Sequence, residues 1–259
     1  MPNLPGASPE DDLETCRQVF ADPAYRPDTL KLYPCVVIES AELFTWWRQG
    51  RYQPYDDETL VELVMQLKSL IPPYVRIERV IRDIPATSIQ AGSKLSNLRE
   101  TALARMQARG LRCRCIRCRE VRDGAIGSVR LVRRDYDASG GHEVFLSFEE
   151  PGTDRLAALL RLRIPSDGNG RTLGCSALEG AALVRELHTY GEHVRVDQHD
   201  AAAAQHRGLG RQLMAEAERI ASEEFGRRRI AVIAGVGVRG YYRKLGYALA
   251  DTYMVKTLG

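Results

Sequence analysis

The sequence predicts an α/β protein built from two differently organised parts. Strand-like and helix-like segments alternate up to about residue 110, which is typical of a parallel sheet. After residue 124, strand-like runs follow one another across glycine or polar turns, which is typical of an antiparallel meander. With 259 residues, 44% of them hydrophobic, the chain is large enough to form both cores.

The composition and the start of the chain exclude two classes of protein. No apolar run reaches the roughly 18 to 20 residues that a transmembrane helix needs. The start, MPNLPGASPEDDLE, is acidic and proline-rich, unlike a basic and then apolar signal segment. We therefore expect a globular protein of the cytoplasm. Six cysteines in a reducing compartment indicate metal binding or chemistry rather than a disulfide framework.

The first part has the order strand, helix, strand. β-branched runs predict strands over residues 29–38 and 74–85, and the segment between them predicts a helix over 56–71. That helix carries leucines at helical spacing, namely Leu60, Leu63, Leu67 and Leu70. A further helix is expected over 96–110, with a serine or asparagine cap and a closing glycine.

The second part reads as a meander followed by a helix and mixed elements. The four strand candidates are residues 128–136, 141–150, 155–165 and 181–191. An amphipathic helix is expected over 210–226, because Leu213, Ala217, Ile220 and Ala221 share one face. The remaining expected elements are a buried strand at 229–235, a short helix at 239–246 and a last strand at 252–258.

A glycine loop opens the amphipathic helix. The segment QHRGLGRQLM, residues 205–214, has the pattern Gln-x-x-Gly-x-Gly. Glycines let a phosphate approach the backbone, and the free N–H groups at a helix start favour negative charge. An ordinary turn is the alternative. A dinucleotide-binding βαβ unit does not fit, because an antiparallel meander precedes the loop.

This order of strand, glycine loop, helix, buried strand and YYRKLGY resembles the acetyltransferase fold of the GNAT superfamily. The resemblance implies that acetyl-CoA lies where two adjacent strands splay apart. It implies that the backbone of residues 187–190 holds the thioester and pantetheine, and that amides near residues 208–212 hold the pyrophosphate. The implied acetyl-CoA-binding residues are Leu187, His188, Thr189, Tyr190, Gln205, Gly208, Gly210, Arg211, Gln212 and Tyr242.

Thioester chemistry needs donors for an oxyanion and an acid for the departing thiolate. The resemblance places Tyr242 near the sulfur, and either Tyr241 or Tyr242 can supply the proton. Glu186 and His188 are candidates for polarising the nucleophile, although either can equally be an ordinary strand residue.

The two parts together resemble the catalytic subunit family of Elongator, tRNA uridine acetyltransferases that join a radical-SAM barrel to a GNAT domain. The segments that carry this resemblance cover nearly the whole chain: MPNLPG, DTLKLYPCVVI, VRIERVIRDIPA, SNLRE, CRCIRCREV, LVRRDY, VRELHTYG, GLGRQLMAEAERIA, GVGVRGYYRKLGY and YMVK. The implied fold is the C-terminal part of a radical-SAM-type (β/α) barrel at residues 1–110, a linker at 111–124 and a GNAT domain at 125–259.

The family's barrel also carries cysteines for a 4Fe–4S cluster that works with SAM. Met1 corresponds to a position already deep in that barrel, and none of the six cysteines matches the cluster motif. We therefore expect acetyl-CoA as the cofactor of this chain, and neither iron–sulfur nor radical-SAM activity.

The linker contains the segment LRCRCIRCREVRDG, residues 111–124. Cys113, Cys115 and Cys118 form C-x-C-x-x-C, three soft ligands on a short loop, and a tetrahedral zinc needs one more. Cys35 is the predicted fourth ligand, chosen over Cys16 because it lies in a rigid strand segment. Reduced, partly buried thiols are the alternative.

Arginines are concentrated around the same segment. Residues 105–134 contain ten arginines and two acidic residues, a net charge of +8, whereas the whole chain carries +3. Arginine binds phosphate in bidentate geometry, so this stripe predicts an RNA-binding surface. The candidate tRNA-binding residues are Arg112, Arg114, Arg117, Arg119, Arg133 and Arg134.

Three functions remain open at this point. The first is a tRNA uridine acetyltransferase that binds the anticodon region, acts on the wobble uridine, and assembles as a homodimer or with other Elongator-type subunits. The second is a GNAT enzyme for lysine or small amines, and the third is a non-catalytic tRNA-binding remnant. Acetyl-CoA turnover with and without tRNA distinguishes them.

Overall fold

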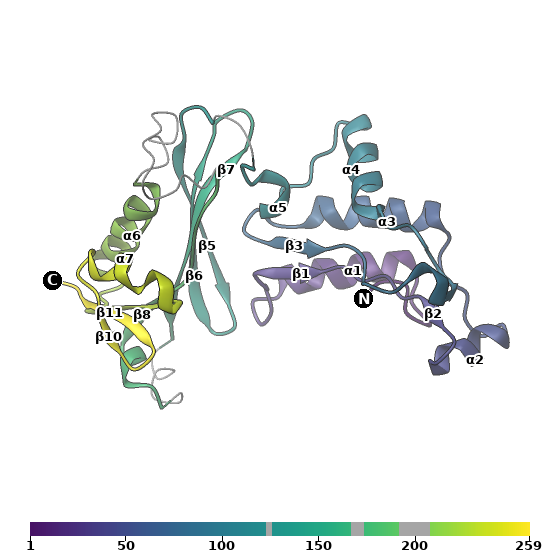
Figure 1. The fold of residues 1–259 in the computed structure, drawn as a ribbon, viewed down its shortest axis with the longest axis horizontal. Helices are drawn as coiled ribbons and strands as arrows, with labels where there is room; N and C mark the ends of the chain where they lie inside the picture. Colours follow the sequence, from purple (N-terminus) through teal and green to yellow (C-terminus); the bar gives the residue numbers. More distant parts are fainter. Residues whose placement is uncertain (123–125, 167–173, 192–207) are drawn as a thin grey trace. The chain divides into compact units, whose positions relative to one another are not determined.

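A computed structural model describes residues 1–122, 126–166, 174–191 and 208–259. The chain divides into two compact units, Met1–Cys118 and Arg119–Gly259 (Figure 1). The boundary between them falls inside the cysteine- and arginine-rich segment. No helix in the described part of the chain is both long and apolar enough to cross a membrane.

The first unit is built from short strands and longer helices. Its β1 and β3 pair in parallel, as the strand–helix–strand order predicts, and α3 lies between them in sequence. The strand predicted over 29–38 is interrupted at Pro34, whose ring cannot donate a ladder hydrogen bond. The bounds are α1 Pro9–Ala21, β1 Thr29–Lys31, β2 Val37–Ile38, α2 Glu42–Arg48, α3 Asp57–Leu70, β3 Arg76–Arg79, β4 Ile89–Ala91, α4 Leu98–Ala108 and α5 Ile116–Arg119.

Helix α3 supplies much of the core of the first unit. Its N-cap Asp56 accepts a hydrogen bond from the Thr59 amide, which satisfies one of the free N–H groups of the first turn. Six hydrophobic side chains of this helix are buried, and so is one lysine, Lys68. Helix α4 begins after Asn97, the predicted cap position, but no side chain caps it; Gly110, with φ +68°, follows its end.

The second unit contains a seven-stranded sheet with the order β10-β11-β9-β8-β7-β6-β5. The predicted antiparallel meander is confirmed for β5 to β8, whereas β8 and β9 pair in parallel and α6 forms the crossover between them. The bounds are β5 Arg130–Ala138, β6 Gly141–Glu149, β7 Leu156–Pro165, β8 Ala181–Thr189, α6 Leu209–Arg219, a π-helical turn Ile220–Glu224, β9 Arg229–Ile233, α7 Arg239–Arg243, β10 Ala248–Ala250 and β11 Tyr253–Thr257.

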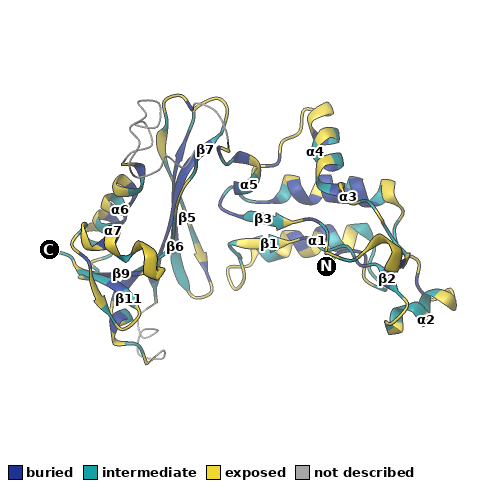
Figure 2. Ribbon diagram, in the orientation of Figure 1, coloured by how far each residue is buried: buried dark blue, intermediate teal, exposed yellow. Residues whose placement is uncertain are grey.

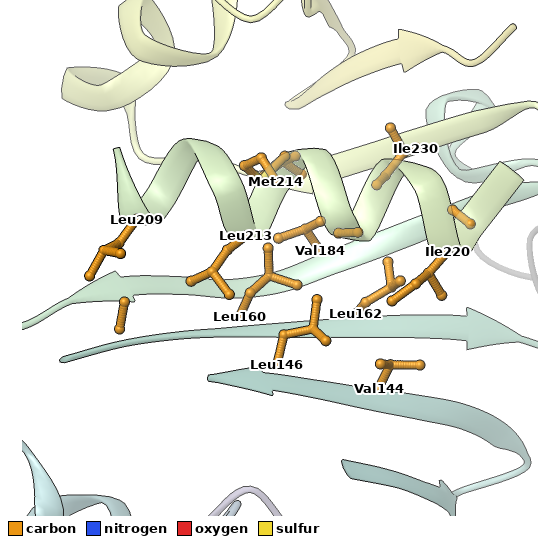
Figure 3. Close-up of a cluster of buried hydrophobic side chains, with 14 of the residues drawn as sticks. Val144, Leu146, Leu160, Leu162, Val184, Leu209, Leu213, Met214, Ile220 and Ile230 are labelled. Atoms are coloured by element: carbon orange, nitrogen blue, oxygen red, sulfur yellow. The ribbon is translucent and has the colours of Figure 1, made fainter. Parts of the chain in front are cut away.

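Helix α6 packs against one face of this sheet. Alternate residues of β6, β7 and β8 are buried on this face. Leu213 of α6 and Ile220 of the π-helical turn that follows it pack against them (Figure 3). The other sheet face is also buried along β6 and β7 (Figure 2), yet it carries charged side chains. These charges are therefore paired, as buried charges must be.

Glu149 is the centre of one such buried cluster of paired charges. Its carboxylate accepts hydrogen bonds from Arg134 Nη1 at 2.6 Å and Ser147 Oγ at 2.7 Å, and Arg119 Nη1 lies 2.9 Å away. Burial raises the pKa of Glu149, but the two arginines and Ser147 outweigh it and hold the pKa at about 2. A second cluster joins Glu143 to Arg163 and Arg185.

Candidate functional site

The pairing of β8 with β9 ends halfway along β8. The parallel ladder covers Ala181 to Val184, whereas Glu186 to Thr189 have partners on β7 alone and Arg185 lies at an irregularity in that pairing. The two strands therefore splay apart at this point. The edge of β8 that faces the gap presents backbone polar groups to an extended ligand.

The N-terminus of α6 opens at the same gap. Its N-cap residue Gly208 has φ +108°, a left-handed conformation that only glycine adopts without strain, and as a glycine it has no side chain with which to cap the helix. The Gln212 amide already bonds to the Gly208 carbonyl at 2.8 Å, so the N–H groups of Leu209, Gly210 and Arg211 precede the first helical bond. Such a terminus attracts a phosphate.

These elements enclose a cavity of about 680 Å³, within the range of small-molecule sites. Its lining comes from β8, the start of α6, and the segment around α7. The lining residues are Leu187, Thr189, Gly208, Gly210, Arg211, Val238, Tyr241 and Tyr242. Seven of the eight were predicted from the sequence; Val238 was not.

Tyr242 is held rigidly at this cavity. It is 6% exposed, and its ring packs edge-on against Tyr241 at 5.2 Å and Tyr247 at 5.9 Å between centroids. Burial raises the pKa of Tyr242 to about 12, and the neighbouring Tyr241 adds to the effect. The phenol therefore stays protonated at neutral pH, which is the state that a proton donor requires.

Tyr241 lies across the cavity from the glycine loop. A Cβ atom at position 210 would lie 3.2 Å from the Tyr241 hydroxyl and 3.6 Å from Thr189 Cγ2. Glycine at position 210 leaves the space between the loop and Tyr241 open, whereas a side chain would project into it. The spacing of the two glycines is thus explained by backbone conformation at Gly208 and by close approach at Gly210.

Several predicted residues lie outside the cavity lining. Glu186 forms an ion pair with the buried Arg161 at 2.8 Å, so its carboxylate is already engaged. The ring of His188 packs on Tyr190 at 4.3 Å between centroids, and the Tyr190 amide bonds to Ala157 of β7 at 2.7 Å. This geometry gives no support to Glu186 or His188 as groups that polarise a nucleophile.

Two glutamines, Gln212 and Gln205, were also predicted to bind acetyl-CoA. Gln212 is exposed on α6 and does not line the cavity. Gln205 lies outside the described residues. No sequence pattern marked Val238 as a lining residue. In the structure, the two valines of its segment GVGVRG are exposed, 78% for Val236 and 51% for Val238.

The predicted cysteine cluster is present in the first unit. The sulfur atoms of Cys113, Cys115 and Cys118 all lie within 4.8 Å of one another. A tetrahedral zinc with Zn–S bonds of about 2.3 Å places its sulfurs about 3.8 Å apart, so the donor set suits a single ion. Hydrogen bonds from the Cys113 and Cys118 thiols lower the pKa of Cys115, and its sulfur also bonds to the Ile77 backbone amide.

Cys35 does not join this cluster. The metal-binding groups found among the described residues consist of the three linker cysteines alone. Cys35 is buried near Asn3, whose side-chain amide bonds to the Cys35 carbonyl at 3.2 Å, and burial raises the pKa of its thiol. The prediction of Cys35 as fourth ligand is corrected accordingly, because its segment is bound to the N-terminus of the chain, where the Cys35 amide donates to the Pro2 carbonyl at 2.9 Å.

The arginine stripe separates into exposed and paired residues. Arg112 and Arg114 are exposed on the loop between α4 and α5. Arg119 is 5% exposed and pairs with Glu149 and Asp154. Arg119 is therefore a structural residue rather than the phosphate ligand that the sequence predicts.

The other predicted arginines either form ion pairs or are partly buried. Arg133 forms ion pairs with Asp135 at 2.9 Å and Glu224 at 2.8 Å, and Arg134 bonds to Glu149. Arg117 is half-buried and lies near Arg99. Charge counted along the sequence thus overestimates the positive charge that is available at the surface.

Comparison with known proteins shows which family the chain resembles. Residues 27–108 match the radical SAM C-terminal domain family. The whole chain is 51% identical to a protein of Dehalococcoides mccartyi named tRNA uridine(34) acetyltransferase, covering 57% of it, and 50% identical to human Elongator complex protein 3, covering 48%. The solved archaeal Elp3 of Methanocaldococcus infernus, which has an N-terminal deletion, matches the whole chain and 62% of that protein with 45% identity and a TM-score of 0.86. Over its whole length the chain is homologous to Elongator complex protein 3.

The match to Elongator complex protein 3 confirms the predicted fold class. It supports a mixed α/β chain of radical-SAM type with the seven-stranded sheet in its second unit. The chain spans about half the length of the curated relatives that it matches.

Radical-SAM proteins imply an iron–sulfur cluster and SAM. In the described part of this chain, the only group of cysteines close enough to share a ligand is the C-x-C-x-x-C triad. Its sulfurs converge on a point suited to a single ion, whereas a cluster spreads its cysteine ligands over several irons. The triad therefore does not fit the cluster.

Proposed function

We propose that this chain supplies the acetyl-CoA-binding and thioester-cleaving part of a tRNA uridine acetyltransferase. The observation that carries the proposal is the cavity at the β8–β9 splay, where an uncapped helix N-terminus, an open strand edge and a buried protonated tyrosine meet. The names of the relatives support tRNA uridine(34) as the substrate. We assign the acetyltransferase domain to residues 125–259, the barrel-derived part to 1–110 and the linker to 111–124.

Each group of cavity residues would contact a different part of acetyl-CoA. The free N–H groups at Gly210 and Arg211 would hold the pyrophosphate, and the open edge of β8 near Leu187 and Thr189 would hold the pantetheine arm. When water or the tRNA acceptor attacks the thioester and takes the acetyl group, Tyr242 would donate its phenolic proton to the departing CoA sulfur, because a thiol leaves more readily than a thiolate. The acetyl group itself comes with acetyl-CoA.

Tyr242→Phe tests this role. The variant should bind acetyl-CoA with nearly unchanged affinity but release free CoA about 100-fold more slowly, because only the proton donor is lost. Tyr253→Phe, on β11 and outside the cavity lining, is the matched control. Calorimetry gives the affinity, and a thiol reagent gives the rate with and without tRNA. An unchanged rate would contradict the assignment of Tyr242, and turnover of lysine or small amines without tRNA would favour the alternative enzyme.

We further propose that the exposed arginines of the linker contact tRNA phosphates near the anticodon. Arg112 and Arg114 are the exposed members of the predicted set in the first unit. The double replacement Arg112→Ala with Arg114→Ala should weaken tRNA binding and lower the slope of log affinity against log salt by about one for each lost contact. Mobility-shift titrations at several salt concentrations measure this slope.

Arg133→Ala is the control for charge alone. It removes one positive charge from a residue paired with Asp135 and Glu224, so the salt slope should stay close to that of the parent protein. A slope that falls in the control and stays constant in the double variant would contradict the assignment. Elongator-type subunits or a second copy of the chain are the partners that we expect.

We also propose that Cys113, Cys115 and Cys118 bind a structural zinc ion. The convergence of three sulfurs supports this, and the fourth ligand is not among the cysteines described. Metal analysis of the native protein tests it, because a bound structural zinc should be retained through purification and lost with a strong chelator.

A further inference from the structure

A lysine is completely buried beside the cysteine cluster. Lys68 is 0% exposed in the last turn of α3, where its ammonium lies 3.8 Å from Cys118 Sγ. It forms no ion pair with a carboxylate in the described part of the chain. An isolated ammonium in an apolar interior is very costly, so a buried lysine either meets a negative charge or loses its own.

Among the described residues, Cys118 Sγ is the polar atom in contact with the Lys68 ammonium, and the sulfurs of Cys113 and Cys115 lie within 4.8 Å of that sulfur. A zinc ion with three thiolates carries a net charge of −1, which one ammonium neutralises. Three neutral thiols would leave the ammonium without any counter-charge.

A second cation lies in the same neighbourhood. Arg99 donates from Nη2 to the Ile77 carbonyl at 3.1 Å, while its buried Nη1 has no hydrogen-bond partner among the described residues. Arg99 lies close enough to the three cysteine sulfurs to interact with each of them electrostatically. Two cations gathered around three sulfurs indicate a centre with negative charge.

We propose that Lys68 is a positioning residue that supplies the buried counter-charge for a three-thiolate metal site at Cys113, Cys115 and Cys118. It donates an N–H···S hydrogen bond to Cys118 and holds that sulfur as the thiolate that a metal requires. The inference rests on the zinc proposal above and deepens it. Metal binding and the charge of Lys68 are therefore coupled, each stabilising the other.

The test compares Lys68→Met, Lys68→Arg and the parent chain. Zinc affinity, measured by competition with a chromophoric chelator under reducing conditions, should fall about 10- to 100-fold in Lys68→Met and recover largely in Lys68→Arg. Lys94→Met, at an exposed lysine of the same unit, should leave the affinity unchanged. If Lys68→Met does not fold, Lys68→Gln gives the same comparison, because it keeps a polar end and removes only the charge.

Thermal unfolding provides a readout that a simple packing role would not produce. Without zinc, Lys68→Met should melt at a higher temperature than the parent, because a buried unpaired charge is gone; with zinc, it should melt at a lower temperature. Parent protein that binds no zinc would overturn the metal site and this inference together. Parent protein that binds zinc, with equal affinity in Lys68→Met, would overturn the role of Lys68 and leave the metal site intact.

Discussion

Gly210→Glu should abolish acetyl-CoA binding while leaving the fold intact. The new side chain would start 3.2 Å from the Tyr241 hydroxyl and 3.6 Å from Thr189, so it would occupy the cavity where the pyrophosphate is expected. A carboxylate beside a phosphate adds repulsion of about 4 kcal/mol at close range near a protein surface. We expect a loss of affinity of at least about 100-fold by calorimetry.

The same substitution should not unfold the protein, because an acidic side chain in the first turn of a helix is favourable. Gly210→Ala is the graded comparison, since its methyl group meets the movable end of Tyr241 at 3.2 Å and makes an ordinary contact with Thr189 Cγ2 at 3.6 Å. Gly240→Glu is the control for charge, because nothing lies within 4 Å of a Cβ at that exposed position. Full acetyl-CoA affinity in Gly210→Glu would refute the location of the site.

Glu149→Gln should destabilise the second unit by about 3 kcal/mol at neutral pH. The substitution removes the charge that neutralises Arg119 and Arg134, and Arg119 is almost fully buried. Because the pKa of Glu149 in the folded protein is about 2, below its ordinary value of 4.5, its contribution is complete above pH 4.5 and is lost as the pH falls toward 2.

Urea unfolding at several pH values measures this effect. The difference in unfolding free energy between the parent and Glu149→Gln should be largest at neutral pH and should shrink as the pH approaches 2. Glu223→Gln, whose side chain is 65% exposed and pairs with Arg219, should change the free energy by less than about 1 kcal/mol. A difference that does not depend on pH would mean that the carboxylate charge contributes little.

Local patterns in the sequence predicted much of the fold and of the cavity. The leucine spacing identified α3, the period-two runs identified β5 to β8, and the glycine loop identified the start of α6. These features depend on backbone periodicity and on turns, which neighbouring residues determine. Helix α1, which begins after a capping box at Ser8, was not predicted, and the strand predicted over 29–38 is interrupted near Pro34.

The main strands and helices of the second unit, the glycine loop that opens α6 and the cysteine triad could therefore be predicted from local sequence patterns. Which charged groups are available depends on the tertiary structure. It paired Arg119 with Glu149, placed Glu186 against Arg161, kept Cys35 out of the triad and buried Lys68 beside it. Whether a charged side chain is available depends on its partner. Partners 25 to 50 residues apart in the sequence are brought together only by strand register and helix packing.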